Sequence, residues 1–142
     1  MIHLESLLRY KGQVQIQIIE KGGNTLNIRT ESRGDVLIAR VSGELDISTV
    51  PYFKKKILDK TESTGINNLV LNLQDVSFID SSGLGAILGR YRYLKKKKGK
   101  VLLVSLKPQV KKIFTMAGML KIMDSYKNED EAMSGFNEGR IA

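Results

Sequence analysis

The stretch from Leu69 to Lys100 constrains the fold more than any other part of the chain. It begins with an apolar run over residues 69–73 of the type found in buried strands, which Val76, Phe78 and Ile79 continue. The polar residues of 80–83 then supply the chemistry of a helix start. One apolar helical face follows, formed by Leu84, Ile87, Leu88 and Tyr91. The stretch therefore predicts a strand that feeds directly into a helix, with two serines at the junction.

The flanking patterns predict one α/β domain over residues 26–142, built on a mixed sheet with about four helices. Alternating apolar residues on either side of Gly34 indicate a hairpin, and a strand, a helix and a strand in succession indicate a parallel crossover. Ser48 and Thr49 are candidate helix caps before Pro51. The remaining expected elements are a short helix lined by Val50, Phe53 and Ile57, a strand over 101–104, a helix from Pro108, an edge strand at Ile122–Met123 and a helix over 128–136.

Residues 1–25 form an amino-terminal extension in this interpretation. Gln residues alternate with apolar ones from Gln13 to Ile18, which predicts an extra edge strand. The alternative is a strand offered to a partner.

Composition excludes several classes of protein. The chain has 142 residues, no cysteine, one histidine (His3) and a net charge of +8. Disulfides, zinc sites and a Ser-His-Asp triad are therefore not expected, and no phosphate-binding loop motif is present. We expect no enzyme activity, cofactor or metal. The absence of a signal-peptide pattern and of an apolar run long enough for a membrane span predicts a cytoplasmic protein.

Four features leave alternatives open. A serine at 81 or 82 either caps the helix or accepts a phosphoryl group. Asp46 is either a turn residue or, with Glu44, an acidic spot. We expect Gly85 and Gly89 to let their helix pack closely against the sheet or a neighbouring helix. Dinucleotide binding is the less favoured alternative. The run Lys95–Lys98 is expected to be a solvated helix end, with nucleic-acid phosphates as the alternative.

Together, the Gly43–Asp46 segment and Leu71–Gly85 resemble the STAS domain of bacterial anti-sigma factor antagonists, the sporulation type in particular. The pieces Ala86–Tyr91, Pro108–Phe114 and Ala117–Leu120 agree with the same pattern. The match covers roughly residues 26 to 136.

The resemblance implies a partner-switching regulator. Ser81 corresponds to the serine that an anti-sigma factor, itself an ATP-dependent serine kinase, phosphorylates in that family. The unphosphorylated antagonist binds the anti-sigma factor and frees the sigma factor, and a serine phosphatase resets the switch. The expected partner-binding residues are Glu44, Asp46, Thr49, Asp80, Ser81, Ser82, Gly83 and Leu84. Asp46 is expected to matter for partner binding more than for stability, because substitutions at exposed turns change stability little.

Three rival functions remain at this point: a stressosome-type STAS scaffold, a nucleotide-binding STAS module, and a nucleic-acid binder suggested only by charge. Neither nucleic acid nor a membrane is an expected partner.

Overall fold

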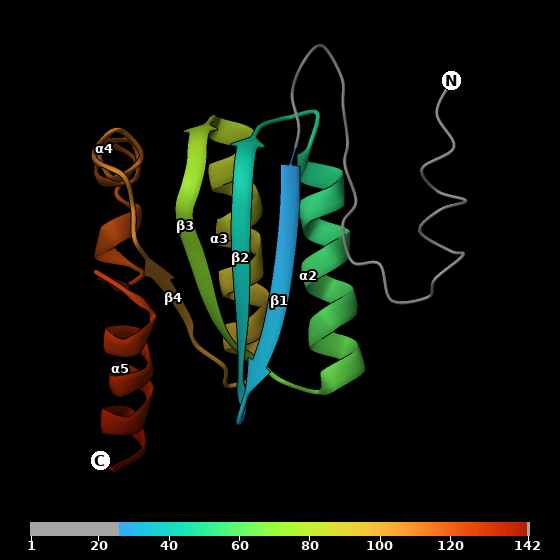
Figure 1. The fold of residues 1–142 in the computed structure, drawn as a ribbon, viewed down its shortest axis with the longest axis vertical. Coiled ribbons are helices and arrows are strands. Elements are labelled where there is room, and N and C mark those ends of the chain that lie inside the picture. The colour runs from blue at the N-terminus through green and yellow to red at the C-terminus, as the bar shows by residue number, and fades with distance from the viewer. Residues whose placement is uncertain (1–25, 142) are drawn as a thin grey trace.

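The computed structural model describes residues 26–141, with side chains described to Phe136. A five-stranded sheet lies at the centre of the molecule, with helices on both faces (Figure 1). The elements are β1 (Leu26–Arg33), β2 (Val36–Leu45), α2 (Val50–Thr64), β3 (Asn68–Ile79), α3 (Ser81–Lys96), β4 (Val101–Val104), α4 (Pro108–Met116), the 3-10 turn η1 (Met119–Lys121), β5 (Ser125–Tyr126) and α5 (Glu129–Ile141). The predicted mixed α/β sheet with four helices is confirmed, whereas the predicted edge strand at residues 13–18 lies outside the described residues.

The strands follow one another across the sheet in the order β1-β2-β3-β4-β5. β1 and β2 form the predicted antiparallel hairpin, closed by Arg33 opposite Val36. Every later pair is parallel, so β2, β3, β4 and β5 all finish at the same edge. The chain must return after each parallel strand, and the three crossovers are α2, α3, and α4 with η1.

The larger hydrophobic core lies between one face of the sheet and the helices α2, α3 and α4. Phe53 of α2, Ile87 of α3 and Phe114 of α4 are each fully buried there against strand residues such as Leu71. At about 25 cal/mol per Å² of apolar area removed from water, such side chains contribute about 1.5–3 kcal/mol each. This packing fixes the start of α3 against the ends of β2 and β3.

The predicted strand at Ile122–Met123 is wrong. Gly118 adopts a left-handed conformation (φ 75°) that ends α4 and begins η1. The amide groups of Ile122 and Met123 then both donate to the carbonyl of Met119 at 3.0 Å. Because those donors are used within the turn, they cannot join a ladder, and the edge strand forms at Ser125–Tyr126 instead.

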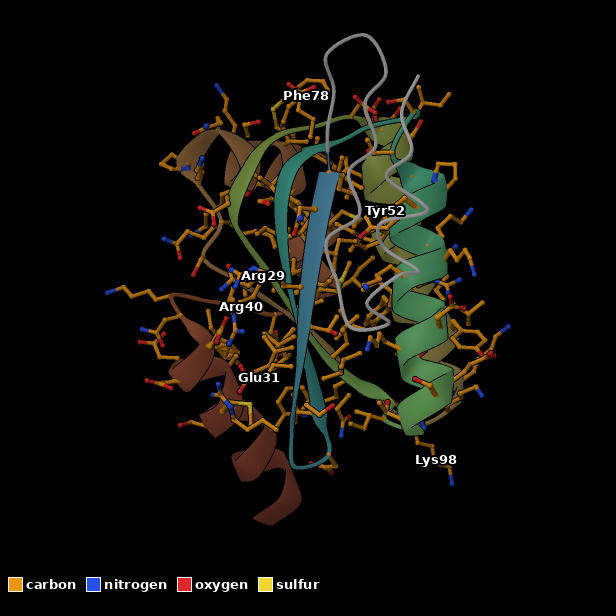
Figure 2. The ribbon with its side chains drawn as sticks, turned by 45° about the vertical axis from the view of Figure 1, so that its right-hand side comes forward. Arg29, Glu31, Arg40, Tyr52, Phe78 and Lys98 are labelled. Atoms are coloured by element: carbon orange, nitrogen blue, oxygen red, sulfur yellow. The ribbon has the colours of Figure 1, made fainter. Side chains whose placement is uncertain are left out.

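The opposite face of the sheet carries α5, which extends to Ile141 and so is longer than predicted. Asn128 caps it by accepting the amide of Glu131 at 2.9 Å. Arg40 of β2 donates two hydrogen bonds to the carboxylate of Glu129, from Nε at 2.8 Å and from Nη2 at 2.9 Å. Nη2 also donates to Glu31 of β1 at 2.8 Å, and Figure 2 shows Arg40 and Glu31 on this face. The network fastens the first turn of α5 to two strands.

We expect Glu129→Gln to lower the free energy of unfolding by about 1–3 kcal/mol, the usual worth of a hydrogen bond to a charged group. The bonds from Arg40 hold the pKa of Glu129 at about 2, below its ordinary 4.5. A lowered pKa contributes stability that is complete above pH 4.5 and disappears as the pH falls towards 2. Urea unfolding at neutral pH and at pH 3 should therefore show a large difference between wild type and variant that shrinks in acid. An equal difference at both pH values would contradict this role of Glu129.

Candidate functional site

The site lies where β2 and β3 end and α3 begins, at the upper edge of the molecule in Figure 1. The register pairs Glu44 with Phe78 and Leu45 with Ile79, so the loops that follow both strands leave the sheet side by side. In open α/β sheets the carboxyl ends of the strands are the usual place for binding. The structure therefore brings together the two sequence segments, 43–46 and 80–84, that were predicted to act together.

Asp80 joins these two loops. One oxygen of its carboxylate accepts the amide of Gly83 at 3.0 Å, which caps α3, and the other accepts the amide of Ile47 at 3.3 Å. Its own amide donates to the carbonyl of Leu45 at 3.3 Å. The cap of α3 is thus an aspartate and not either serine, so capping does not use the hydroxyls of Ser81 and Ser82.

Ser81 is the first residue of α3 and is exposed. Its hydroxyl makes no hydrogen bond to any other described residue. The first turn of a helix carries free amide groups and a partial positive charge, and α3 has no acidic residue in its first turn. Of the amides in this turn, that of Gly83 already donates to the Asp80 carboxylate. Ser82 and Leu84 beside it are partly buried.

Asp46, expected at an exposed turn, is instead buried with an exposed fraction of 6%, and Thr49 is buried with an exposed fraction of 0%. The Asp46 carboxylate accepts the hydroxyl of Ser48 at 2.7 Å and the amides of Ser48 and Thr49 at 2.9 and 3.2 Å. Burial raises the pKa of Asp46, but these hydrogen bonds together outweigh it and leave the pKa below its ordinary value. Both residues hold the loop in shape, and Glu44 is the partly exposed acid of this segment.

Thr49 reaches back into the loop instead of capping α2. Its hydroxyl donates to the carbonyl of Glu44 at 2.8 Å and accepts the amide of Asp46 at 3.0 Å. Thr49 occupies the predicted N-cap position of α2, but its side chain makes no capping hydrogen bond to that helix.

The expectation that Gly85 and Gly89 allow close packing is wrong. A Cβ added to either would meet no atom within 4 Å. The close approach occurs at Gly83, where a Cβ would lie 2.5 Å from the carbonyl oxygen of Leu45 and 2.8 Å from Ile79. Gly83 therefore lets the first turn of α3 rest directly on the end of β2.

Alanine at these two glycines should have opposite effects. Gly83→Ala should lower stability by about 1–2 kcal/mol, because overpacking a backbone oxygen outweighs the gain in helix propensity. Gly85→Ala should raise stability by about 0.5–1 kcal/mol, because it gains propensity in open space. Thermal unfolding of both variants measures this directly. A Gly83→Ala protein as stable as Gly85→Ala would show that the close approach is absent.

Two apolar residues of the site were missed by sequence reasoning. Ile47 is 75% exposed and Phe78 is 46% exposed, and Figure 2 shows Phe78 at this edge of the molecule. The sequence pattern places Phe78 in the buried run of β3. A shift of register between Gly43 and Glu44 breaks the alternation, so that Ser77 and Phe78 are both exposed. Two large exposed apolar side chains at one edge of the sheet make this edge a candidate protein-binding surface.

The described residues hold no group of His, Cys, Asp and Glu side chains that could bind a metal ion. The helices formed by residues 26–141 are all too short or too polar to span a bilayer. A polar cleft of about 410 Å³ is lined by Arg29, Arg40, Asn72 and Glu129 among others. It lies on the α5 face of the sheet, away from Ser81.

Comparison with known proteins agrees with this geometry. The family model for the STAS domain matches residues 27–132. The anti-sigma F factor antagonist of Paenibacillus polymyxa is 38% identical over 109 residues, which is 77% of this chain and 93% of that protein. The Bacillus cell fate determinant SpoIIAA in its phosphorylated form is 29% identical with a TM-score of 0.61, over 77% of this chain and 98% of that one.

SpoIIAA in its unphosphorylated form, described as an anti-sigma factor antagonist, has a TM-score of 0.62 and 26% identity over 79% of this chain and 98% of that one. The same fold is thus found in a relative with and without its phosphoryl group. The chain described here belongs to the STAS domain family, with relatives that are anti-sigma factor antagonists.

Proposed function

We propose that this protein is an anti-sigma factor antagonist that works by partner switching. Unphosphorylated, it binds an anti-sigma factor that is also a serine kinase, and the sigma factor is released. Phosphorylation of Ser81 ends the binding, and a serine phosphatase restores it. The observation that carries the proposal is an exposed serine at the start of α3, near exposed Ile47 and Phe78, whose hydroxyl bonds to no other residue that the structure describes. The STAS relatives named above support it.

Ser81 is a better phosphoacceptor than the other serines of this edge. Ser82 is partly buried, and the hydroxyl of Ser77 donates to the carbonyl of Gly43 at 3.4 Å. A kinase must reach the hydroxyl and align it with a nucleotide phosphate, which favours an exposed side chain free of other bonds.

The partner-binding residues fall into two groups under this proposal. Glu44, Ser81, Ser82 and Leu84 contact the partner, together with Ile47 and Phe78 at the rim. The other four act by fixing the shape of the two loops: Asp46, Thr49 and Gly83, which are buried, and Asp80, which is partly buried. Apolar side chains surrounded by polar ones give an interface its desolvated centre.

The proposal assigns the switch to the STAS domain, residues 26–142, with residues 1–25 as an extension. It is a regulatory protein of the cytoplasm and not an enzyme. The chemistry belongs to the kinase and the phosphatase, which supply the groups that act on the Ser81 hydroxyl.

The experiment is capture of partners by full-length Ser81→Ala protein from its native cell extract. This variant cannot be phosphorylated on Ser81, so it should retain a kinase-fold anti-sigma factor. The captured kinase is then incubated with ATP and wild-type protein, and the phosphopeptide is mapped. Phosphate on Ser81, with none in a Ser81→Ala control that keeps Ser82 and Ser77, is the expected result. Phosphate on Ser82, or no captured kinase, would refute the assignment.

A further inference from the structure

The last turns of α3 and the residues after it form a surface of one charge sign, which we call the basic end of α3. Between Asp80 and Asp124 the chain has no acidic residue. None of these cations forms a salt bridge with another described residue. The members of the basic end are Arg90, Arg92, Lys95, Lys96, Lys97, Lys98 and Lys100.

Lys98 occupies a backbone conformation that favours glycine. Its φ is 65°, and it follows the helix end where the amide of Gly99 donates to the carbonyl of Leu94 at 2.8 Å. Glycine is the usual residue at this position of a helix end, because a Cβ is strained there. A lysine in a strained backbone position points to a role for its charge, since stability alone would favour glycine.

Aromatic and apolar groups lie within the basic end. Lys95 sits over the ring of Tyr91 at 5.5 Å, while Arg90 and Lys97 each sit 5.1 Å from the centre of the Tyr93 ring. A shallow cleft of about 220 Å³ is lined by Lys95, Lys100, Tyr91 and Ile122, together with the carboxylate-bearing Asp124. Ile122 is 49% exposed.

We propose that the basic end of α3, with Ile122 beside it, docks on a bilayer surface that carries anionic phospholipids. A cluster of lysines is attracted to anionic headgroups, and the flexible lysine stems suit a diffuse layer of charge better than one fixed site. The exposed side chain of Ile122 matches the interfacial zone, where apolar groups enter and polar groups stay hydrated. Nucleic acid fits less well, because cations already cover the tyrosine faces that would stack on bases.

This docking would leave the Ser81 site free. Figure 2 shows Lys98 and Phe78 at opposite ends of the molecule. A helix as long as α3, from Ser81 to Lys96, separates its ends by roughly 24 Å at 1.5 Å per residue. Bilayer binding is therefore independent of the proposed function and can be tested without any protein partner.

The test is co-sedimentation of the full chain with vesicles of phosphatidylcholine, with and without phosphatidylglycerol. We expect binding only to the anionic vesicles, weakened by salt. The double variant Lys96→Gln/Lys97→Gln should bind at least tenfold more weakly, because each cation at such a surface is worth about fivefold. The matched control Lys111→Gln/Lys112→Gln removes the same charge from α4, at the other edge of the sheet, and should change binding little.

Two further variants test separately the charge of Lys98 and the apolar side chain of Ile122. Lys98→Gly should bind about fivefold more weakly and yet melt at a higher temperature, which excludes unfolding as the reason. Ile122→Ser should weaken vesicle binding at constant net charge. The proposal is overturned if the wild type does not bind anionic vesicles at low salt. It is overturned as well if the α4 control loses as much vesicle affinity as Lys96→Gln/Lys97→Gln. It is also overturned if Ile122→Ser binds unchanged, or if mixed-sequence duplex DNA at equal phosphate concentration displaces the protein from vesicles.

Discussion

Ser81→Asp should lower the affinity for the anti-sigma factor by roughly 100-fold or more while leaving the domain folded. In the proposed complex, the carboxylate would lie in the contact surface with Ile47 and Phe78, whose side chains are exposed. Removing a charge from water without a matching cation costs several kcal/mol, and each 1.4 kcal/mol is tenfold in affinity. A phosphoryl group carries more charge and should have a larger effect.

Within the isolated domain, the same change should be nearly neutral. A negative charge at the amino end of α3 gains about 0.3–1 kcal/mol from the free amides, and repulsion from the Asp80 carboxylate offsets part of it. The melting temperature should therefore stay within about 4 °C of wild type.

The control is Ser134→Asp, which places the same charge on an exposed position of α5, on the opposite face of the sheet. Calorimetric titration with the anti-sigma factor should show wild-type affinity for this control and for Ser81→Ala. Tight binding of Ser81→Asp would refute the switch, and a Ser81→Asp protein that has unfolded would refute the claim that it acts at the interface.

The sequence was sufficient to predict the elements that depend on local patterns. Three such elements were predicted: the hairpin around Gly34, the crossover through α3 and the junction at Ser81. Each of them follows from the pattern of apolar and polar residues over a short stretch. The end of α3 was predicted as well, although glycine was expected as its stop. The structure uses Lys98 in the left-handed position and Gly99 one residue later, where a Cβ would collide with the backbone of Asn67.

The parts that were not predicted depend on contacts between distant segments. Asp46 was expected at an exposed turn, but the loop folds inward because three donors from Ser48 and Thr49 converge on its carboxylate. Phe78 was assigned to the buried run, and a register shift against Gly43 exposes it. Neither burial nor a bulge is encoded in the residue type alone, so both required the three-dimensional structure.

Asp46→Ala should lower the free energy of unfolding by about 2–4 kcal/mol, which reverses the expectation that Asp46 matters little for stability. The substitution removes the acceptor of the Ser48 hydroxyl and amide, and one of the two acceptors of the Thr49 amide, which also donates to the backbone carbonyl of Asp46 at 3.1 Å. Hydrogen bonds to a charged group are worth about 1.5–3 kcal/mol each but do not add fully, because water and loop movement replace some of them. The melting temperature should fall by about 10 °C, which thermal unfolding measures.

The acid dependence gives this prediction a second measurement. Because the pKa of Asp46 lies below its ordinary value of 3.8, its contribution is complete above that value and is lost as the pH falls further. The difference between wild type and Asp46→Ala should therefore narrow in strong acid. Glu44→Ala is the matched control, since it removes a partly exposed carboxylate from the same segment and should change stability by less than about 0.5 kcal/mol. If Asp46→Ala melts like Glu44→Ala, the loop is not held in shape by the Asp46 carboxylate.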